Sequence, residues 1–137
     1  AALAIRTPTS IRPGQHVIEP LAGYLVLAQS LWSEPELAGP WNFGPDPSEN
    51  ASVREVIEMA RSAWGEADVA YGASTGPHEA GRLTLETAKA RELLNVRPRW
   101  GLQESVTRTV TWYRRLIEGT SARALCEEDI VAWECAR

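Results

Sequence analysis

Two short segments of this 137-residue chain combine residue types that can bind a ligand. The first runs from Arg12 to Val17 and places a glutamine, Gln15, and a histidine, His16, directly before a helical pattern. The free N–H groups and positive dipole of a helix N-terminus favour an anion. An arginine suits a phosphate because its guanidinium forms bidentate, charge-assisted hydrogen bonds. Spacing alone nevertheless favours a simpler interpretation, in which Arg12 is a surface residue and His16 packs locally.

The second segment is the glycine-flanked stretch 76–81, which places His78 beside Glu79. A flexible loop with an imidazole and a carboxylate can position a sugar hydroxyl, although a His-Glu pair in a loop is usually solvated. Its spacing is not that of a metal site, and Cys126 and Cys135 form no zinc pattern with the two histidines. We therefore predict no metal site and interpret the cysteines as reduced thiols of a cytosolic protein.

Sequence motifs that carry catalysis are missing from the chain. It contains no glycine-rich dinucleotide turn, no phosphate-binding loop and no nucleophile elbow. None of its three tyrosines, at positions 24, 71 and 113, is followed by a lysine four residues later. We expect no catalytic and no cofactor-binding residue within this chain.

Net charge and the length of the apolar runs exclude further classes of protein. A net charge of −4 argues against a nucleic-acid partner, which calls for a basic surface. No apolar run approaches the roughly 20 residues of a membrane helix. For a chain of 15.1 kDa that folds as one compact domain, surface scaling predicts about 7,000 Å² of exposed area.

The elements that must position these residues follow from apolar periodicity and capping signals. Five helices are predicted, at residues 18–32, 52–64, 87–94, 102–118 and 126–135. Strands or extended segments are predicted at residues 3–12, 41–45 and 68–71. Ser52 and Glu55 form a capping box, Thr87 is expected to cap the third helix, and Gly65 and Gly119 end the second and fourth.

Tryptophans and basic residues are distributed along the predicted helices. The six tryptophans are spread singly, which predicts core packing. Seven basic residues interleave with glutamates at helical distances, which predicts a salt-bridged, solvated face; they are Lys89, Arg91, Arg97, Arg99, Arg108, Arg114 and Arg115.

In chain order, these segments resemble the C-terminal half of the extended short-chain dehydrogenase/reductase family, the sugar-nucleotide epimerases and dehydratases. The family carries Arg-x-x-x-His-Val before a helix, here residues 12–17, and then an Asn-x-Gly segment, here 41–45. A capped helix, an acidic residue before Lys-Ala-Arg, and a long helix containing Trp-Tyr follow in order. Within the family, residues 5–24, 38–45 and 77–80 are similar to the CDP-glucose 4,6-dehydratases.

The resemblance implies an α/β fold class. The chain would be the C-terminal substrate-binding lobe of a Rossmann-type protein, mostly helical with a few short strands and without the Rossmann sheet itself. Residues 1–137 would then be the sugar-nucleotide-binding portion of a longer, cytoplasmic, homo-oligomeric enzyme whose N-terminal domain binds NAD.

The resemblance also implies a reaction, a hydro-lyase step of deoxysugar biosynthesis. The longer enzyme would oxidise C4 of CDP-glucose, eliminate water across C5–C6 and return the hydride at C6, giving CDP-4-keto-6-deoxyglucose. Its catalytic groups would lie in the N-terminal portion, so we expect this chain alone to be inactive.

Site residues are implied in the same way. Arg12 would contact the diphosphate of the nucleotide sugar. Gln15, His16 and Arg6 would line the nucleotide side of the cleft. His78 and Glu79 would lie near the diphosphate or the nucleoside.

Several positions depart from the family pattern and leave the choice of nucleotide open. Gly14 stands where the family has tryptophan, and Gly76 and Gly81 stand where it has histidine; Thr7 replaces asparagine and Glu86 replaces aspartate. Two alternatives therefore stay open. One is a related epimerase or dehydratase that uses another nucleotide, and the other is a non-catalytic helical binding module.

Overall fold

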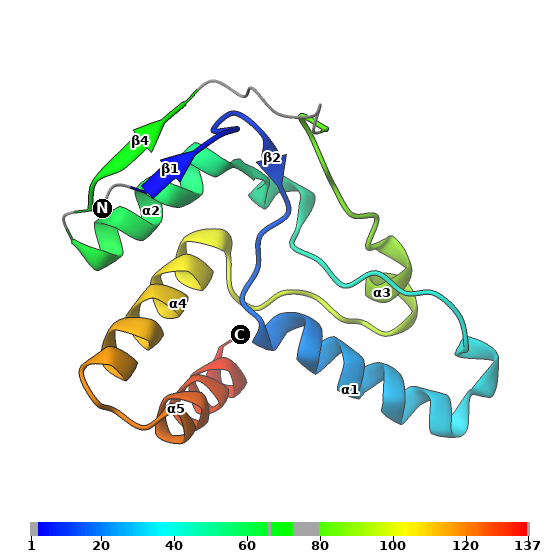
Figure 1. The fold of residues 1–137 in the computed structure, drawn as a ribbon. Coiled ribbons are helices and arrows are strands. Elements are labelled where there is room, and N and C mark those ends of the chain that lie inside the picture. Colours follow the sequence, from blue (N-terminus) through cyan, green and yellow to red (C-terminus); the bar gives the residue numbers. More distant parts are fainter. Residues whose placement is uncertain (1–2, 66, 73–79, 137) are drawn as a thin grey trace.

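Helices form most of the structure, a computed structural model that describes residues 3–65, 67–72 and 80–136 (Figure 1). The two candidate residues His78 and Glu79 lie outside these described ranges. The helices are α1 (Ile18–Ser33), α2 (Val53–Trp64), α3 (Ala88–Leu93), α4 (Leu102–Ile117) and α5 (Ala122–Cys135). All five predicted helices are therefore present. None of the described helices has the length and apolar content that crossing a bilayer requires.

Two small sheets of two strands each complete the described part of the chain. Strand β1 (Leu3–Ile5) pairs in parallel with β4 (Val69–Tyr71), and β2 (Ile11–Arg12) pairs antiparallel with β3 (Ala51–Ser52). The strand expected at 68–71 is confirmed as β4. No full Rossmann sheet is present among these residues.

The strand expected at residues 41–45 was wrong. In the described structure no strand pairs with this segment, and a strand forms only where a neighbour supplies backbone hydrogen bonds. Side chains hold the segment instead: the Gln15 side-chain amide donates to the Phe43 carbonyl (3.1 Å), and the Asn42 amide donates to the Glu86 carbonyl (3.2 Å).

Local capping explains where three helices begin. The capping box of Ser52 and Glu55 at the start of α2 is confirmed, with both reciprocal hydrogen bonds present. Helix α5 begins four residues earlier than predicted because the Ser121 hydroxyl accepts from the Ala124 N–H (3.2 Å). The expected cap of α3 by Thr87 was wrong, since the Glu86 carboxylate accepts from the Ala88 N–H instead (2.5 Å).

The interior of the molecule is small. Helix α2 packs against α4, and α4 and α5 form a helical hairpin beside it (Figure 1). The buried hydrophobic residues are Ala51, Ala90, Leu94, Trp100, Leu102 and Leu125. Trp100 fulfils the prediction of tryptophan core packing, whereas Trp32 is 93% exposed and contradicts it. The chain exposes 9203 Å², well above the roughly 7,000 Å² that its mass predicts for a compact domain.

Candidate functional site

The two segments singled out in the sequence meet at strand β2. The Ile11 N–H donates to the Gly81 carbonyl (2.9 Å), and the Leu83 N–H donates to the Ile11 carbonyl (3.1 Å). The Arg12 side chain adds to this junction, because its Nη1 donates to the carbonyls of Ile11 and Ala80, both at 2.9 Å. The structure thus brings Arg12 to the end of the stretch that contains the predicted His-Glu pair.

Backbone contacts hold Arg12 in place. It pairs with Ala51 across the β2–β3 sheet and is half-buried, so its guanidinium is fixed at the edge of this sheet. A guanidinium carries five N–H donors in a planar fork. Two of those of Arg12, both on Nη1, are engaged by the Ile11 and Ala80 carbonyls. Arg6, the other candidate arginine, follows β1 and is exposed.

His16 lies in the interior, only 7% exposed, at the start of α1. Its Nδ1 accepts from the Ile18 N–H (3.3 Å), and its ring meets the Trp100 ring edge to face at 4.9 Å between centroids. Its Nε2 lies 3.8 Å from Oδ2 of Asp129 on α5. Burial lowers the pKa of His16, and the negative charge of Asp129 opposes this shift. The imidazole thus joins the start of α1 to Trp100 in the segment before α4 and to Asp129 of α5.

Gln15 takes a similar positioning role beside His16. The Gln15 side-chain amide donates a hydrogen bond to the Phe43 carbonyl. In the first turn of α1, the Glu19 carboxylate accepts hydrogen bonds from the backbone N–H groups of Arg99 (3.1 Å) and Trp100 (2.9 Å). Glu19 is buried, and no signal in its spacing indicated this contact, because its partners lie 80 and 81 residues further along the chain. These side chains fix the start of α1 against two distant segments.

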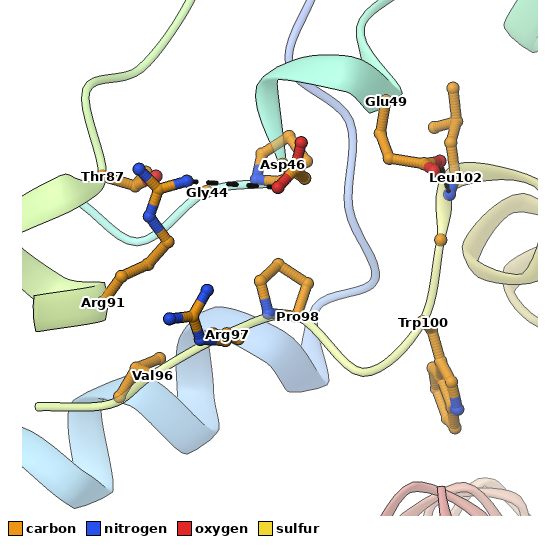
Figure 2. Close-up of a pocket in the computed structure, with 12 residues that line it drawn as sticks. Gly44, Asp46, Glu49, Thr87, Arg91, Val96, Arg97, Pro98, Trp100 and Leu102 are labelled. Carbon is orange, nitrogen blue, oxygen red and sulfur yellow. Dashed lines mark hydrogen bonds and ion pairs between the residues drawn. The ribbon is translucent and has the colours of Figure 1, made fainter. Parts of the chain in front are cut away.

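A separate pocket of about 260 Å³ lies between the 44–49 segment, α3 and the 96–102 segment (Figure 2). Arg91 lies 4.0 Å from the Asp46 carboxylate, with Arg97 on the wall below (Figure 2). Hydrogen bonds from Ser48 lower the pKa of Asp46, and Arg91 and Arg97 lower it further. The Glu49 carboxylate accepts from the Leu102 N–H at the start of α4 (2.7 Å).

This pocket offers little proton-transfer chemistry. Its lining contains two guanidiniums and two carboxylates, so the formal charges balance, and the lowered pKa keeps Asp46 ionised near neutral pH. No sequence signal indicates this pocket, because Asp46 lies in a proline-rich turn far from Arg91 and no spacing connects the two residues.

The predicted salt-bridged face is confirmed for two helical pairs. Arg108 pairs with Glu104 (2.6 Å), and Arg114 pairs with Glu118 (3.5 Å). Other members of the set behave differently. Arg115 binds Glu128 of α5 through both terminal nitrogens, and the Lys89 ammonium lies 4.0 Å from the centre of the Trp41 ring.

Metal-ligating side chains do not cluster in the described structure. No group of three or more histidine, cysteine, aspartate or glutamate residues there could hold a metal ion. Cys126 and Cys135 are both exposed free thiols.

Comparisons with known proteins agree with the motifs. No family model matches the chain. It is 42% identical over 117 residues to a CDP-glucose 4,6-dehydratase of Salmonella typhimurium, a match that covers 84% of this chain and 33% of that protein. The chain thus spans about a third of the length of the curated relative that it matches, and the matched part is C-terminal in that relative.

Solved structures confirm the fold. A UDP-glucuronic acid 4-epimerase of Bacillus cereus matches with a TM-score of 0.70 at 20% identity, over 84% of this chain and 36% of that one. A dTDP-glucose 4,6-dehydratase of Bacillus anthracis matches with a TM-score of 0.63 at 15% identity, over 83% and 34%. The mostly helical, few-stranded part of an extended short-chain dehydrogenase/reductase fold, expected from the motifs, is therefore confirmed.

Proposed function

We propose that this chain, a relative of the CDP-glucose 4,6-dehydratases, is the sugar-nucleotide-binding portion of a longer dehydratase. The observation that carries the proposal is the 42% identity over 84% of the chain, combined with coverage of only a third of the relative. The chain binds and orients the substrate, and the chemical steps belong to the remaining two thirds. The reaction is the conversion of CDP-glucose to CDP-4-keto-6-deoxyglucose and water.

NAD is the cofactor that we assign to the longer protein. When bound, NAD would supply the hydride acceptor for the oxidation at C4 of the glucose and the hydride donor for the reduction at C6. Residues that fit this cofactor are missing from the present sequence, which has no glycine-rich turn after a strand. We therefore place the dinucleotide site outside residues 1–137.

Arg12 is the residue that we assign to the substrate diphosphate. It is half-buried at the edge of the β2–β3 sheet and bonded to Ala80, so its guanidinium has a defined position before any ligand binds. Charge-assisted hydrogen bonds from a fixed arginine are strong and directional. Ala80 directly follows His78 and Glu79, which we assign to the same end of the ligand. We retain Arg6 as a nucleotide-side residue.

Gln15 and His16 follow Arg12 in the sequence, and we assign them a supporting role at this site. Both lie within four residues of Arg12, yet their side chains contact Phe43, Ile18 and Trp100. We propose that they position the backbone that follows Arg12.

The nucleotide of the substrate has a second candidate, which rests on the surroundings of Gly14. A Cβ at Gly14 would lie 3.1 Å from Cδ1 of Leu102, so the tryptophan of the family pattern would fit here only if Leu102 moved. The wall beside Arg12 therefore differs from that of the relatives, and a uridine or thymidine nucleotide is the second candidate substrate.

Titration calorimetry with CDP-glucose tests the proposal. We expect binding by the unmodified chain, at least about tenfold weaker binding by Arg12→Ala, and an intermediate affinity for Arg12→Lys, which keeps the charge but loses the fork. Arg123→Ala is the matched control, since Arg123 is exposed on α5 and pairs only with Glu127 among the described residues. UDP-glucose and dTDP-glucose test the nucleotide.

Two outcomes of the titration contradict the proposal. Equal affinities for the unmodified chain and Arg12→Ala would remove the diphosphate assignment. The absence of binding for all three nucleotide sugars would favour the non-catalytic binding module.

The proposal also covers the cellular compartment and the oligomeric state of the longer protein. We assign the longer protein to the cytoplasm, which is supported by the two free, exposed cysteines. We also propose that it is a homo-oligomer, paired through helices outside this chain.

A further inference from the structure

The pocket between the 44–49 segment, α3 and the 96–102 segment has a lining of its own. None of the residues assigned to the substrate, Arg12 included, contributes to it. Its volume of about 260 Å³ lies just below the roughly 300–1,000 Å³ of pockets for drug-sized ligands, so it suits a smaller molecule. The polar groups on its walls indicate which kind of molecule fits.

Two arginines of this pocket are available to an anion. Arg97 is exposed, and its side chain forms no hydrogen bond or ion pair within the described ranges. Arg91 forms one loose ion pair there, in which Nη1 lies 4.0 Å from Oδ2 of Asp46. Figure 2 shows both guanidiniums on the side of the pocket away from Glu49. Guanidinium N–H groups without fixed partners bind phosphate oxygens in a forked geometry.

Thr87, just before α3, adds a buried hydroxyl to the same lining. The residue is only 5% exposed, and its methyl group faces Gly44, where an added Cβ would lie 3.3 Å from Cγ2. The hydroxyl does not cap α3 and makes no hydrogen bond in the part of the chain that the structure describes. Because buried hydroxyls are normally hydrogen-bonded, this one indicates a partner that enters the pocket.

The two carboxylates of the pocket each have one oxygen left for a ligand. Asp46 accepts through Oδ1 from the Ser48 N–H (2.9 Å) and hydroxyl (2.7 Å), and Glu49 accepts through Oε2 from the Leu102 N–H (2.7 Å). Oδ2 of Asp46 and Oε1 of Glu49 accept no hydrogen bond from a described residue. An ionised carboxylate only accepts, so these two oxygens suit the hydroxyl groups of a ligand.

We propose that this pocket binds a hydroxylated phosphomonoester of the size of a sugar phosphate. The phosphate oxygens accept from the two guanidiniums and the Thr87 hydroxyl, and the sugar hydroxyls donate to the two carboxylates. A simple anion would leave both carboxylates without a donor, and an uncharged sugar would leave both arginines without an anion. The site is independent of the proposed function, because none of its residues is assigned to CDP-glucose.

Titration calorimetry of the unmodified chain with glucose 6-phosphate tests the proposal. We expect binding below about 10 mM ligand, and at least about tenfold weaker binding of inorganic phosphate, which brings no sugar hydroxyls for the carboxylates. Glucose, which has no phosphate, should not bind measurably over the same range. The amide NMR signals of residues 87, 91, 97 and 101 should shift when glucose 6-phosphate binds.

Matched arginine variants test the anion contact. Arg97→Gln is expected to weaken glucose 6-phosphate binding at least about tenfold, because it removes a charged donor. Arg123→Gln is the control, since Arg123 is an exposed arginine of α5 that pairs with Glu127, and it should change the affinity by less than about twofold.

Matched threonine variants test the hydroxyl contact. Thr87→Val keeps the shape of the side chain and removes the hydroxyl, so we expect at least about threefold weaker binding. Thr87→Ser keeps the hydroxyl and should retain most of the affinity. Arg97→Gln alters an exposed side chain without a described partner, so it provides a folded variant even if Thr87→Val does not fold.

Four outcomes would overturn the proposal. The first two are no binding of glucose 6-phosphate at about 10 mM and equal affinities for the unmodified chain and Arg97→Gln. The third is binding of inorganic phosphate as tight as that of glucose 6-phosphate, which would identify a simple anion site. The fourth is an equal loss of CDP-glucose affinity in Arg97→Gln, which would make the pocket part of the substrate site. Failure of CDP-glucose to bind the unmodified chain would contradict the proposed function alone.

Discussion

Arg12 and Glu19 show how different the roles of residues seven positions apart can be. Arg12 joins β2 to Ala80 at the sheet edge, whereas Glu19 is buried and accepts from two backbone N–H groups of the 99–100 segment. Family motifs identified Arg12 from the sequence. Nothing local identified the partners of Glu19, because a carboxylate near a helix start is commonly solvated or interacts with the helix dipole.

Glu19→Ala is expected to destabilise the chain by about 2–4 kcal/mol. The substitution leaves the N–H groups of Arg99 and Trp100 without their acceptor in a largely buried environment. Chemical denaturation measures the change, and the exposed Glu36→Ala serves as the control. A loss no larger than that of the control would show that water replaces the carboxylate.

His16 makes stability depend on pH in the range near neutrality. Burial lowers its pKa in the folded state below the ordinary value of 6.5, so the unfolded chain binds more protons there. The free energy of unfolding is therefore expected to be fully retained above about pH 7 and to fall as the pH drops through the unfolded value. Denaturation between pH 7.5 and 5.5, at roughly half-unit steps, measures the slope.

His16→Gln should flatten this slope. The lowered pKa values of Asp46, Glu55, Glu58 and Glu128 cause losses only at more acid pH, because unfolded carboxylates titrate near 4. Identical slopes for the unmodified chain and His16→Gln would contradict the role assigned to the buried imidazole.

At the scale of elements, the sequence predicted the helices better than the strands. Apolar periodicity and caps act within a few residues, so α1, α2 and α4 end within about one or two positions of their expected bounds. Strands depend on partners far along the chain. The segment 41–45 has strand composition but no paired neighbour in the described structure, whereas β4 forms because β1 lies beside it.

The capping box of α2 provides a test at this scale. Ser52→Ala is expected to cost about 1 kcal/mol, because the Ser52 hydroxyl accepts from the Glu55 N–H at the helix start. Ser62→Ala in the same helix is the control and should be neutral or slightly stabilising, since alanine has the higher helix propensity. Equal effects of the two substitutions on thermal unfolding would contradict the capping contribution.

At the scale of the whole molecule, the solvent-exposed area of the chain distinguishes it most clearly from a compact domain of the same mass. Length alone predicted a compact domain, and the structure instead exposes 9203 Å² with Leu25 and Trp32 on its surface. Periodicity identifies which residues of a helix are apolar, but it does not indicate what covers them. The family motifs supplied that context, because their order implied a longer protein.

The chain alone is expected to show neither NAD binding nor dehydratase turnover. Its sequence lacks the glycine-rich turn of a dinucleotide site, and its described strands form only two-stranded sheets. Fluorescence titration with NADH and an assay for the keto product with NAD present check this expectation. Clear NAD-dependent turnover by the isolated 137 residues would contradict the proposal that this chain binds the substrate while the chemical steps belong to the rest of the longer protein.

Phosphorus NMR of CDP-glucose tests the central claim most directly, because it observes the diphosphate that Arg12 is assigned to bind. The account predicts that the unmodified chain shifts and broadens both diphosphate resonances and that Arg12→Ala abolishes most of this effect, while Arg123→Ala preserves it. Unchanged resonances with the unmodified chain, or equal changes with Arg12→Ala, would contradict the account.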